Sequence, residues 1–143
     1  MDTERREFIK KSCSLCASLI GIVALAPITQ SCSPLLTIKT DVKQGGILVM
    51  RSNFTAENKI VLIKNTSFEF DIALVQLSQD EFKALEMKCS HQANSLVPTK
   101  NGFFCNAHGS SFTLEGKVKN PPATGNLKEY KVEITADTVI VIV

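Results

Sequence analysis

Two short clusters of cysteine and histidine constrain this chain more than any other feature of its sequence. One is Cys89-Ser90-His91, the other is Cys105-Asn106-Ala107-His108, and together they contain both histidines of the 143-residue chain. Histidines scattered through a core have no reason to pair with cysteines, whereas thiolate and imidazole are donors that zinc and iron centres use. The sequence therefore predicts a metal centre made by Cys89, His91, Cys105 and His108.

Two kinds of metal centre use two cysteines and two histidines. A structural zinc ion takes them as a tetrahedron, usually with cysteine grouped with cysteine and histidine with histidine. Here each pair is mixed. Mixed pairs on two loops suit an iron-sulfur cluster in which one iron takes two thiolates and the other takes two imidazoles. The spacing favours the cluster, and the alternative is a zinc-binding structural module of an exported lipoprotein.

The rest of the chain has the pattern of β-strands. Its 44% hydrophobic and 21% charged residues are those of a folded globular protein. Runs of β-branched and aromatic residues predict strands at 46–51, 59–64, 68–75, 82–89, 102–106, 128–134 and 138–143. Ala136-Asp137 is expected to make the turn of a final hairpin. The stretch 89–124, rich in Asn, Ser, Gly, Pro and Thr, is expected to be dominated by loops, which commonly carry binding residues.

The amino-terminal segment has the profile of an export signal. Residues 2–11 are densely charged, residues 12–38 carry no charge, and Arg5-Arg6-Glu7-Phe8-Ile9-Lys10 resembles the bacterial twin-arginine signal. The apolar run 13–28 is short for a membrane span of about 20 residues, although an uncleaved anchor is the alternative. We expect residues 1–31 to be a signal segment and residues 32–143 to form one domain.

Three of the five cysteines lie in or beside this segment. Cys13 and Cys16 are expected to act only as small hydrophobic residues. Cys32 stands where bacterial lipoprotein signals place the cysteine that is acylated. Because Gln30 fits such a signal poorly, cleavage near Ser31 that leaves Cys32 as a free thiol is the alternative. A lipid at Cys32 or an N-terminal anchor would hold the protein at a membrane.

The second cluster is followed by further motifs in a specific order. It continues as Gly109-Ser110-Ser111-Phe112, and then come Gly116-Lys117-Val118 and Pro122-Ala123. From about residue 45 to the C-terminus the chain thereby resembles the Rieske family, with its Cys-x-His and Cys-x-x-His-Gly-Ser motifs. The resemblance implies an all-β fold, an antiparallel β sandwich with a cluster-binding lobe inserted near residues 87–124. It also implies one 2Fe-2S cluster per chain.

The resemblance further assigns roles to single residues. Cys89 and Cys105 would bind one iron, and His91 and His108 would bind the other, exposed iron. Ser110 stands where the family's serine donates a hydrogen bond to a bridging sulfide, and Phe112 where a tyrosine often donates to a cysteine sulfur. Quinol-oxidising members join the two loops by a disulfide, but this chain has Asn94 and Ala107 at those places. We therefore expect the cluster alone to hold the two ligand loops together.

These expectations together imply electron transfer. Imidazole in place of thiolate makes the cluster less negative and raises its potential into about −150 to +300 mV. We expect an exported protein on the periplasmic side of the cytoplasmic membrane or at another envelope membrane. Its partner would be a redox protein or a quinol-oxidising complex of the cytochrome bc and b6f kind. Nucleic acid is not an expected partner at a net charge of +2, and no catalytic site of its own is expected, since both histidines are ligands.

Overall fold

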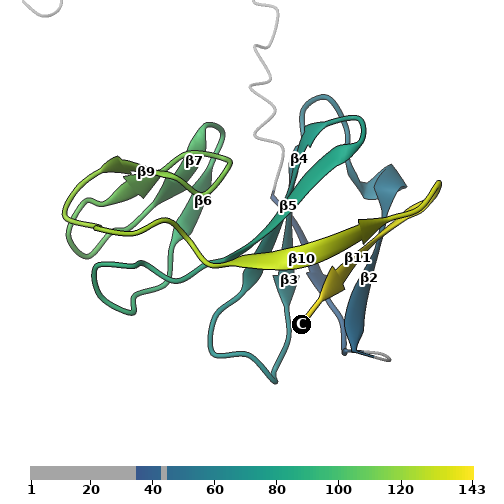
Figure 1. Cartoon of the computed structure of the whole chain (residues 1–143), viewed down its shortest axis with the longest axis horizontal. Helices are drawn as coiled ribbons and strands as arrows, with labels where there is room; N and C mark the ends of the chain where they lie inside the picture. Colours follow the sequence, from purple (N-terminus) through teal and green to yellow (C-terminus); the bar gives the residue numbers. More distant parts are fainter. Residues whose placement is uncertain (1–34, 43–44) are drawn as a thin grey trace, which may run out of the picture. The chain divides into compact units, whose positions relative to one another are not determined.

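The structure is a computed structural model that describes residues 35–42 and 45–143. The predicted signal segment and Cys32 lie outside the described residues. The described chain consists of strands and one short 3-10 turn (Figure 1). These elements are β1 (Leu36–Lys39), β2 (Gly46–Met50), η2 (Arg51–Asn53), β3 (Ile60–Lys64), β4 (Ile72–Ser78), β5 (Glu81–Glu86), β6 (Val97–Thr99), β7 (Gly102–Phe104), β8 (Ser111–Phe112), β9 (Val118–Asn120), β10 (Glu129–Ile134) and β11 (Thr138–Ile142). Within these residues, no helix has the length and apolar character needed to cross a membrane.

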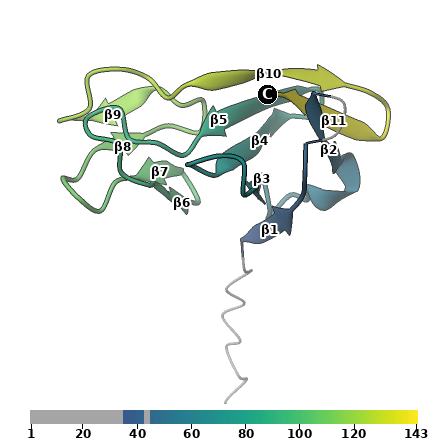
Figure 2. The same cartoon turned by 90° about the horizontal axis from the view of Figure 1, so that it is seen from below.

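The strands form two sheets. The larger has the order β1-β3-β4-β5-β10-β11-β2 and is antiparallel except for the parallel pair β1 and β3. It curls so that strands β3, β4 and β5 face β11 and β2 across a shared apolar core, which includes Ile47, Ile63, Leu74 and Val141. The smaller sheet, β6-β7-β8-β9, forms a separate lobe (Figure 2). The expected all-β fold, a sandwich with an inserted lobe, is confirmed.

The boundaries of several strands differ from the sequence-based expectation. The stretch 89–124 contains four short strands, which pair as β6 to β9 with two or three residues each. Runs this short carry too few residues for a periodic pattern, and their pairing with each other is a tertiary event. The predicted strand 68–75 begins only at Ile72, and β1 was not predicted. The final hairpin between β10 and β11 is confirmed by the pairing of Ile134 with Val139.

Strands β5 and β10 connect the large sheet to the lobe. Their ladder comprises only the pairs Glu129 with Leu85 and Tyr130 with Ala84. Beyond the ladder, the Glu86 backbone N–H donates to the Lys128 carbonyl at 2.9 Å, and the Tyr130 hydroxyl donates to Glu86 Oε1 at 2.9 Å. The entry and the exit of the lobe are therefore fixed to each other on the large sheet.

Candidate metal centre

The first ligand loop is a tight turn that follows β5. The Cys89 backbone N–H donates to the Asn94 carbonyl at 2.9 Å, and the Leu96 N–H donates to the Met87 carbonyl at 3.0 Å. The chain therefore reverses direction within residues 89–94. The turn places the Cys89 side chain in the interior, with 2% of the residue exposed, while His91 is half-buried.

The second ligand loop closes the hairpin between β7 and β8. The Cys105 N–H donates to the Ser110 carbonyl at 2.9 Å, and the Gly109 N–H donates to the Cys105 carbonyl at 3.0 Å. Gly109 has a φ of 79°, a left-handed conformation that glycine adopts without the steric cost of a side chain. Cys105 is buried with 1% exposed, whereas His108 is exposed to solvent.

The two loops present the four predicted donors as two buried thiols, Cys89 and Cys105, and two adjoining imidazole rings, His91 and His108. Cys89 and Cys105 are both buried free thiols, and they belong to the same apolar cluster. The rings of His91 and His108 meet edge to face, with their centroids 4.9 Å apart. Within the described residues, no group of three or more His, Cys, Asp or Glu side chains converges as a site for a metal ion.

The surroundings of the thiol pair favour negative charge on sulfur. Burial raises the pKa of Cys89, but hydrogen bonds from the backbone of His91 and Gln92 lower it. Further hydrogen bonds from the side chains of Cys105 and Ser110 also lower it, so the pKa lies below the ordinary thiol value. These donors would equally stabilise a thiolate bound to iron.

His91 carries an unsatisfied buried nitrogen. Its Nδ1 atom is buried and has no hydrogen-bond partner. Buried polar atoms without a partner are rare in native proteins, and an ion is one of the few groups that satisfies them. Together with the paired thiols, this nitrogen makes the donor set fit a cluster whose two irons take different ligands.

Ser110 and Phe112, the two residues expected to influence the cluster, are both buried. Ser110 is the single buried polar side chain in the described part of the chain. Its Oγ accepts the backbone N–H of Ala123 at 3.0 Å, and its side chain is one of the groups that lower the pKa of Cys89. Phe112 is buried with 1% exposed and belongs to the apolar cluster below the loops, so its ring offers no hydrogen-bond donor there.

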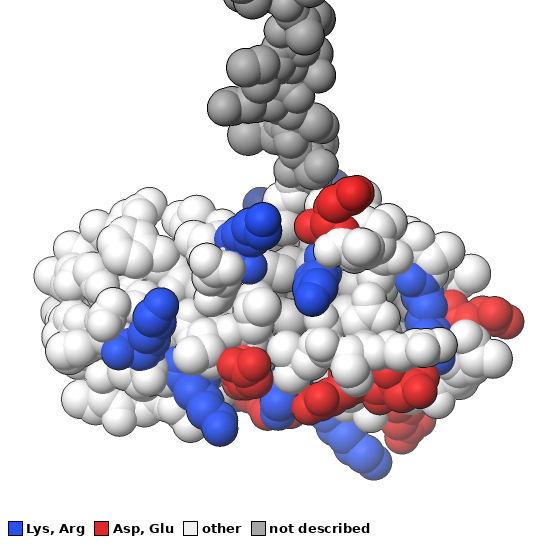
Figure 3. All heavy atoms as spheres, turned by 90° about the horizontal axis from the view of Figure 1, so that it is seen from above, with Lys and Arg blue, Asp and Glu red and all other residues white. Residues whose placement is uncertain are grey.

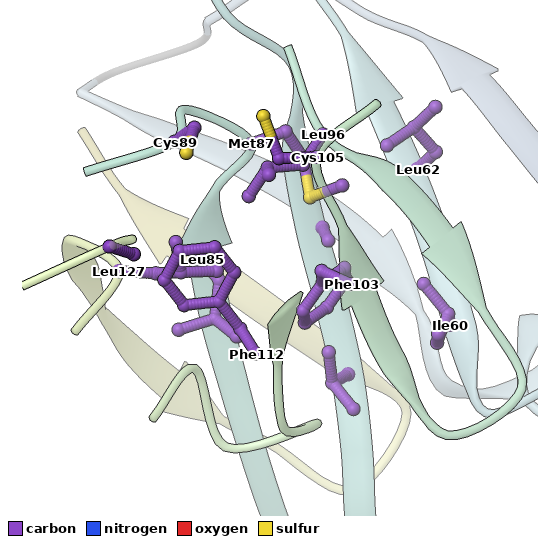
Figure 4. Close-up of a cluster of buried hydrophobic side chains, with 13 residues drawn as sticks. Ile60, Leu62, Leu85, Met87, Cys89, Leu96, Phe103, Cys105, Phe112 and Leu127 are labelled. Carbon is purple, nitrogen blue, oxygen red and sulfur yellow. The ribbon is translucent and has the colours of Figure 1, made fainter. Parts of the chain in front are cut away.

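An apolar cluster supports both ligand loops from beneath (Figure 4). Met87 and Leu96 flank the first loop, and Phe103 and Phe112 flank the second. Leu85 and Leu62 of the large sheet belong to the same cluster, so the lobe is packed on the sheet. Close packing of this kind restricts the positions available to the two cysteines, which are themselves members of the cluster.

Ser90 makes a contact that the sequence analysis did not identify. Its hydroxyl donates to the Gly125 carbonyl at 2.5 Å, across 35 positions of the chain. Gly125 follows Pro121 and Pro122 in a third loop, which approaches both ligand loops. A serine between a cysteine and a histidine carries no periodic signal, so only the folded loops could show this contact.

The surface formed by the three loops carries no charge. Residues 89–99, 101–114 and 120–127 contain no Asp, Glu, Lys or Arg. On the face drawn in Figure 3, the left-hand tip of the molecule is white, blue side chains lie next to it, and both blue and red side chains lie over the rest of the surface. Phe104 and Val97, paired across β6 and β7, add exposed apolar area at 40% and 43% exposure.

Comparisons with known proteins agree with this site. The chain matches the Rieske [2Fe-2S] domain family over residues 39–131. It is 24% identical to the cytochrome b6-f complex iron-sulfur subunit of Chlorobaculum thiosulfatiphilum, over 99% of this chain and 76% of that protein. Among solved structures, it resembles the plasma membrane Rieske protein of Synechocystis PCC 6803, with 23% identity, a TM-score of 0.51 and coverage of 58% of this chain and 85% of the other.

A second solved structure shares the fold along nearly the whole chain. It is a chain of a hyperthermophilic respiratory Complex III, with 14% identity and a TM-score of 0.53, and the match covers 95% of this chain and 92% of that one. At this identity the likeness describes the fold alone. The family match spans well over half of the chain. The chain therefore belongs to the Rieske [2Fe-2S] domain family, and its cofactor is a 2Fe-2S cluster.

Proposed function

We propose that this protein transfers single electrons through a 2Fe-2S cluster bound by Cys89 and Cys105 at one iron and by His91 and His108 at the other. The observation that carries the proposal is the buried Nδ1 of His91, which has no hydrogen-bond partner among the described residues and belongs to a ring that meets the ring of His108. The other two proposed ligands, Cys89 and Cys105, are buried free thiols. When bound, such a cluster accepts and releases one electron, with potentials of about −150 to +300 mV across the family. No separate substrate is needed for this function.

The exposure of the four proposed ligands indicates from which side electrons would reach the cluster. Cys89 and Cys105 hold the interior side, where the apolar cluster excludes water. His108 is exposed, and His91 is half-buried beside it. The imidazole side is therefore the side that a partner can approach. Ser110 is positioned to donate a hydrogen bond toward sulfur, which offsets the negative charge gained on reduction.

We further propose that the partner is a quinol-oxidising membrane complex and that the chain is one of its subunits. Two observations support this assignment. The relative in Chlorobaculum thiosulfatiphilum is a cytochrome b6-f subunit, and the match to it extends over 99% of this chain. The three loops contain no charged residue, which suits a partner with an uncharged docking site rather than a charged soluble carrier.

Export by the twin-arginine route, in the folded state, completes the proposal. A cluster needs the folded ligand loops, because the unfolded chain offers no preformed site. Residues 1–31 would direct export, residues 32–143 would form the Rieske domain, and a lipid at Cys32 or the N-terminal segment would hold the domain on the periplasmic side. The Arg5-Arg6 pair and the uncharged run that follows it support this arrangement.

Metal analysis and spectroscopy of the purified protein test the cluster and its ligands. We expect two irons and two acid-labile sulfides per chain, a red-brown colour and a paramagnetic signal after reduction. Imidazole nitrogens coupled to the unpaired electron should be visible in that signal. A colourless protein with one zinc ion and no labile sulfide would refute the proposed function.

Two experiments test location and partner. Replacing Arg5 and Arg6 together by lysine keeps the charge, and we expect the protein to stay in the cytoplasm. Cys32→Ala should release the exported protein from the membrane if a lipid is the attachment. In membranes, a quinol analogue should reduce the cluster through the complex, whereas the purified protein should not be reduced. Equal reduction in both preparations would contradict a partner complex.

A further inference from the structure

We propose that Ser90 is a positioning residue, and that the segment 123–125 ties the two ligand loops together through Ser90 and Ser110. The inference rests on the proposed function, because it treats residues 89–94 and 105–110 as the loops that bind the cluster. It assigns to hydrogen bonds the task of holding the two ligand loops together, since neither loop contains a second cysteine that could form a disulfide between them.

Each ligand loop is bonded to the segment from a different side. From the first loop, the Ser90 hydroxyl donates to the Gly125 carbonyl at 2.5 Å. From the second loop, Ser110 Oγ accepts the Ala123 N–H at 3.0 Å. The two partners on the segment are only two residues apart. The two loops are therefore linked by a path that runs from Ser90 to Gly125, along the backbone of residues 123–125, and from Ala123 to Ser110.

The segment is itself held in place, which a bridge requires. Ala123 is buried in the apolar cluster, and so is Leu127 just beyond the segment. The Leu127 N–H donates to the Gly116 carbonyl at 2.9 Å, and the Val118 N–H donates to Asn126 Oδ1 at 3.1 Å. Because the segment is anchored at both ends, a bond to it restrains a loop relative to the core rather than to another mobile loop.

The bridge differs from the other contacts between the loops. Those contacts include the edge-to-face meeting of the rings of His91 and His108. They involve side chains that bind iron or sulfide in the proposed cluster. The Ser90 bond uses a carbonyl that is not a ligand, so it would act equally with and without the cluster. Its loss should therefore loosen the first loop without changing the donors to sulfur.

Three variants of the full-length cluster-loaded protein test the proposal. Ser90→Ala removes the bond, Ser90→Thr keeps a hydroxyl, and Ser95→Ala is the control in the same loop. The Ser95 hydroxyl is exposed and makes no hydrogen bond to other described residues. The measurement is the rate at which visible absorption disappears in the presence of an iron chelator, together with the reduction potential and the width of the reduced-state paramagnetic signal.

We expect Ser90→Ala to lose its cluster about fivefold faster than the parent, the equivalent of one net hydrogen bond of about 1 kcal/mol. Its paramagnetic signal should broaden, because a looser loop holds its ligands in a wider range of positions. The potential should stay close to that of the parent, and Ser90→Thr and Ser95→Ala should release the cluster at the parent rate. An unchanged release rate in Ser90→Ala would overturn the proposal.

A double variant tests the bridge itself. Cutting either bond breaks the link between the loops, so Ser90→Ala should accelerate cluster loss less in a Ser110→Ala background than in the parent. Independent, multiplicative effects would mean that Ser90 and Ser110 act separately, and the bridge would be rejected. Failure of the proposed function is distinguishable, since it would appear as a parent protein without the 2Fe-2S spectrum.

Discussion

Ser110 accepts a hydrogen bond from the backbone of Ala123 at 3.0 Å, and this contact occupies one acceptor site of its hydroxyl while leaving the proton available to donate. The same side chain contributes to lowering the pKa of Cys89. A hydroxyl has one proton, and the Ala123 N–H occupies an acceptor site of the oxygen, so the proton is free to point toward sulfur. This relationship leads to a prediction about the reduction potential.

Ser110→Ala should lower the potential of the cluster by roughly 60 to 130 mV. A hydrogen bond to a charged group contributes about 1.5 to 3 kcal/mol, and for one electron about 59 mV corresponds to a tenfold change in equilibrium. Protein-film voltammetry measures the shift. Ser111→Ala is the matched control, because the Ser111 hydroxyl is hydrogen-bonded to Asn120 instead. A Ser110→Ala potential equal to that of the parent would show that the hydroxyl does not act on the cluster.

Phe112→Tyr should raise the potential by an amount similar to the Ser110 effect or smaller. The ring is buried in the apolar cluster that also contains Cys89 and Cys105, and we expect a hydroxyl added to it to donate to a cysteine sulfur. If the new hydroxyl found no acceptor, its burial would instead destabilise the protein by about 1 to 3 kcal/mol. Voltammetry combined with thermal unfolding separates the two results, and a lower stability at unchanged potential would contradict the prediction.

Substitutions of the proposed ligands should have two different effects on the cluster, depending on whether a thiolate is removed or added. Cys89→Ser and Cys105→Ser should abolish the cluster, because each removes a thiolate from the buried side. His91→Cys or His108→Cys should lower the potential of any cluster that forms, since an added thiolate makes the centre more negative. Iron and sulfide content and the visible spectrum report both classes. Cys32→Ala should keep the full cluster, and full iron content in either serine variant would refute the ligand assignment.

Gly102→Ala should destabilise the lobe strongly. A Cβ atom at Gly102 would lie 2.0 Å from the Phe112 carbonyl oxygen, and the φ of 142° is one that side chains rarely allow. β7 and β8 would have to separate, which displaces both Cys105 and Ser110. We expect a loss of more than about 2 kcal/mol and reduced cluster content. Gly125→Ala is the control, since a Cβ there meets no atom within 4 Å, and its unfolding temperature should match that of the parent.

The sequence by itself determined the chemistry of the site and the class of the fold. The two Cys and His clusters are local motifs, so their donors and their spacing are visible without a structure. The large strands were also predictable, because runs such as Ile60–Lys64 and Thr138–Ile142 carry enough β-branched residues to form a pattern. The uncharged character of the three loops can likewise be read directly from the residues.

Only the tertiary structure decided how these residues meet. The four strands of the lobe are too short to have a periodicity of their own, and they exist because they pair with one another over the apolar cluster. The contacts of Ser90 with Gly125 and of Ser110 with Ala123 join positions 35 and 13 residues apart. Hydrogen bonds between distant loops depend on where packing places those loops, and no local pattern of residues encodes that placement.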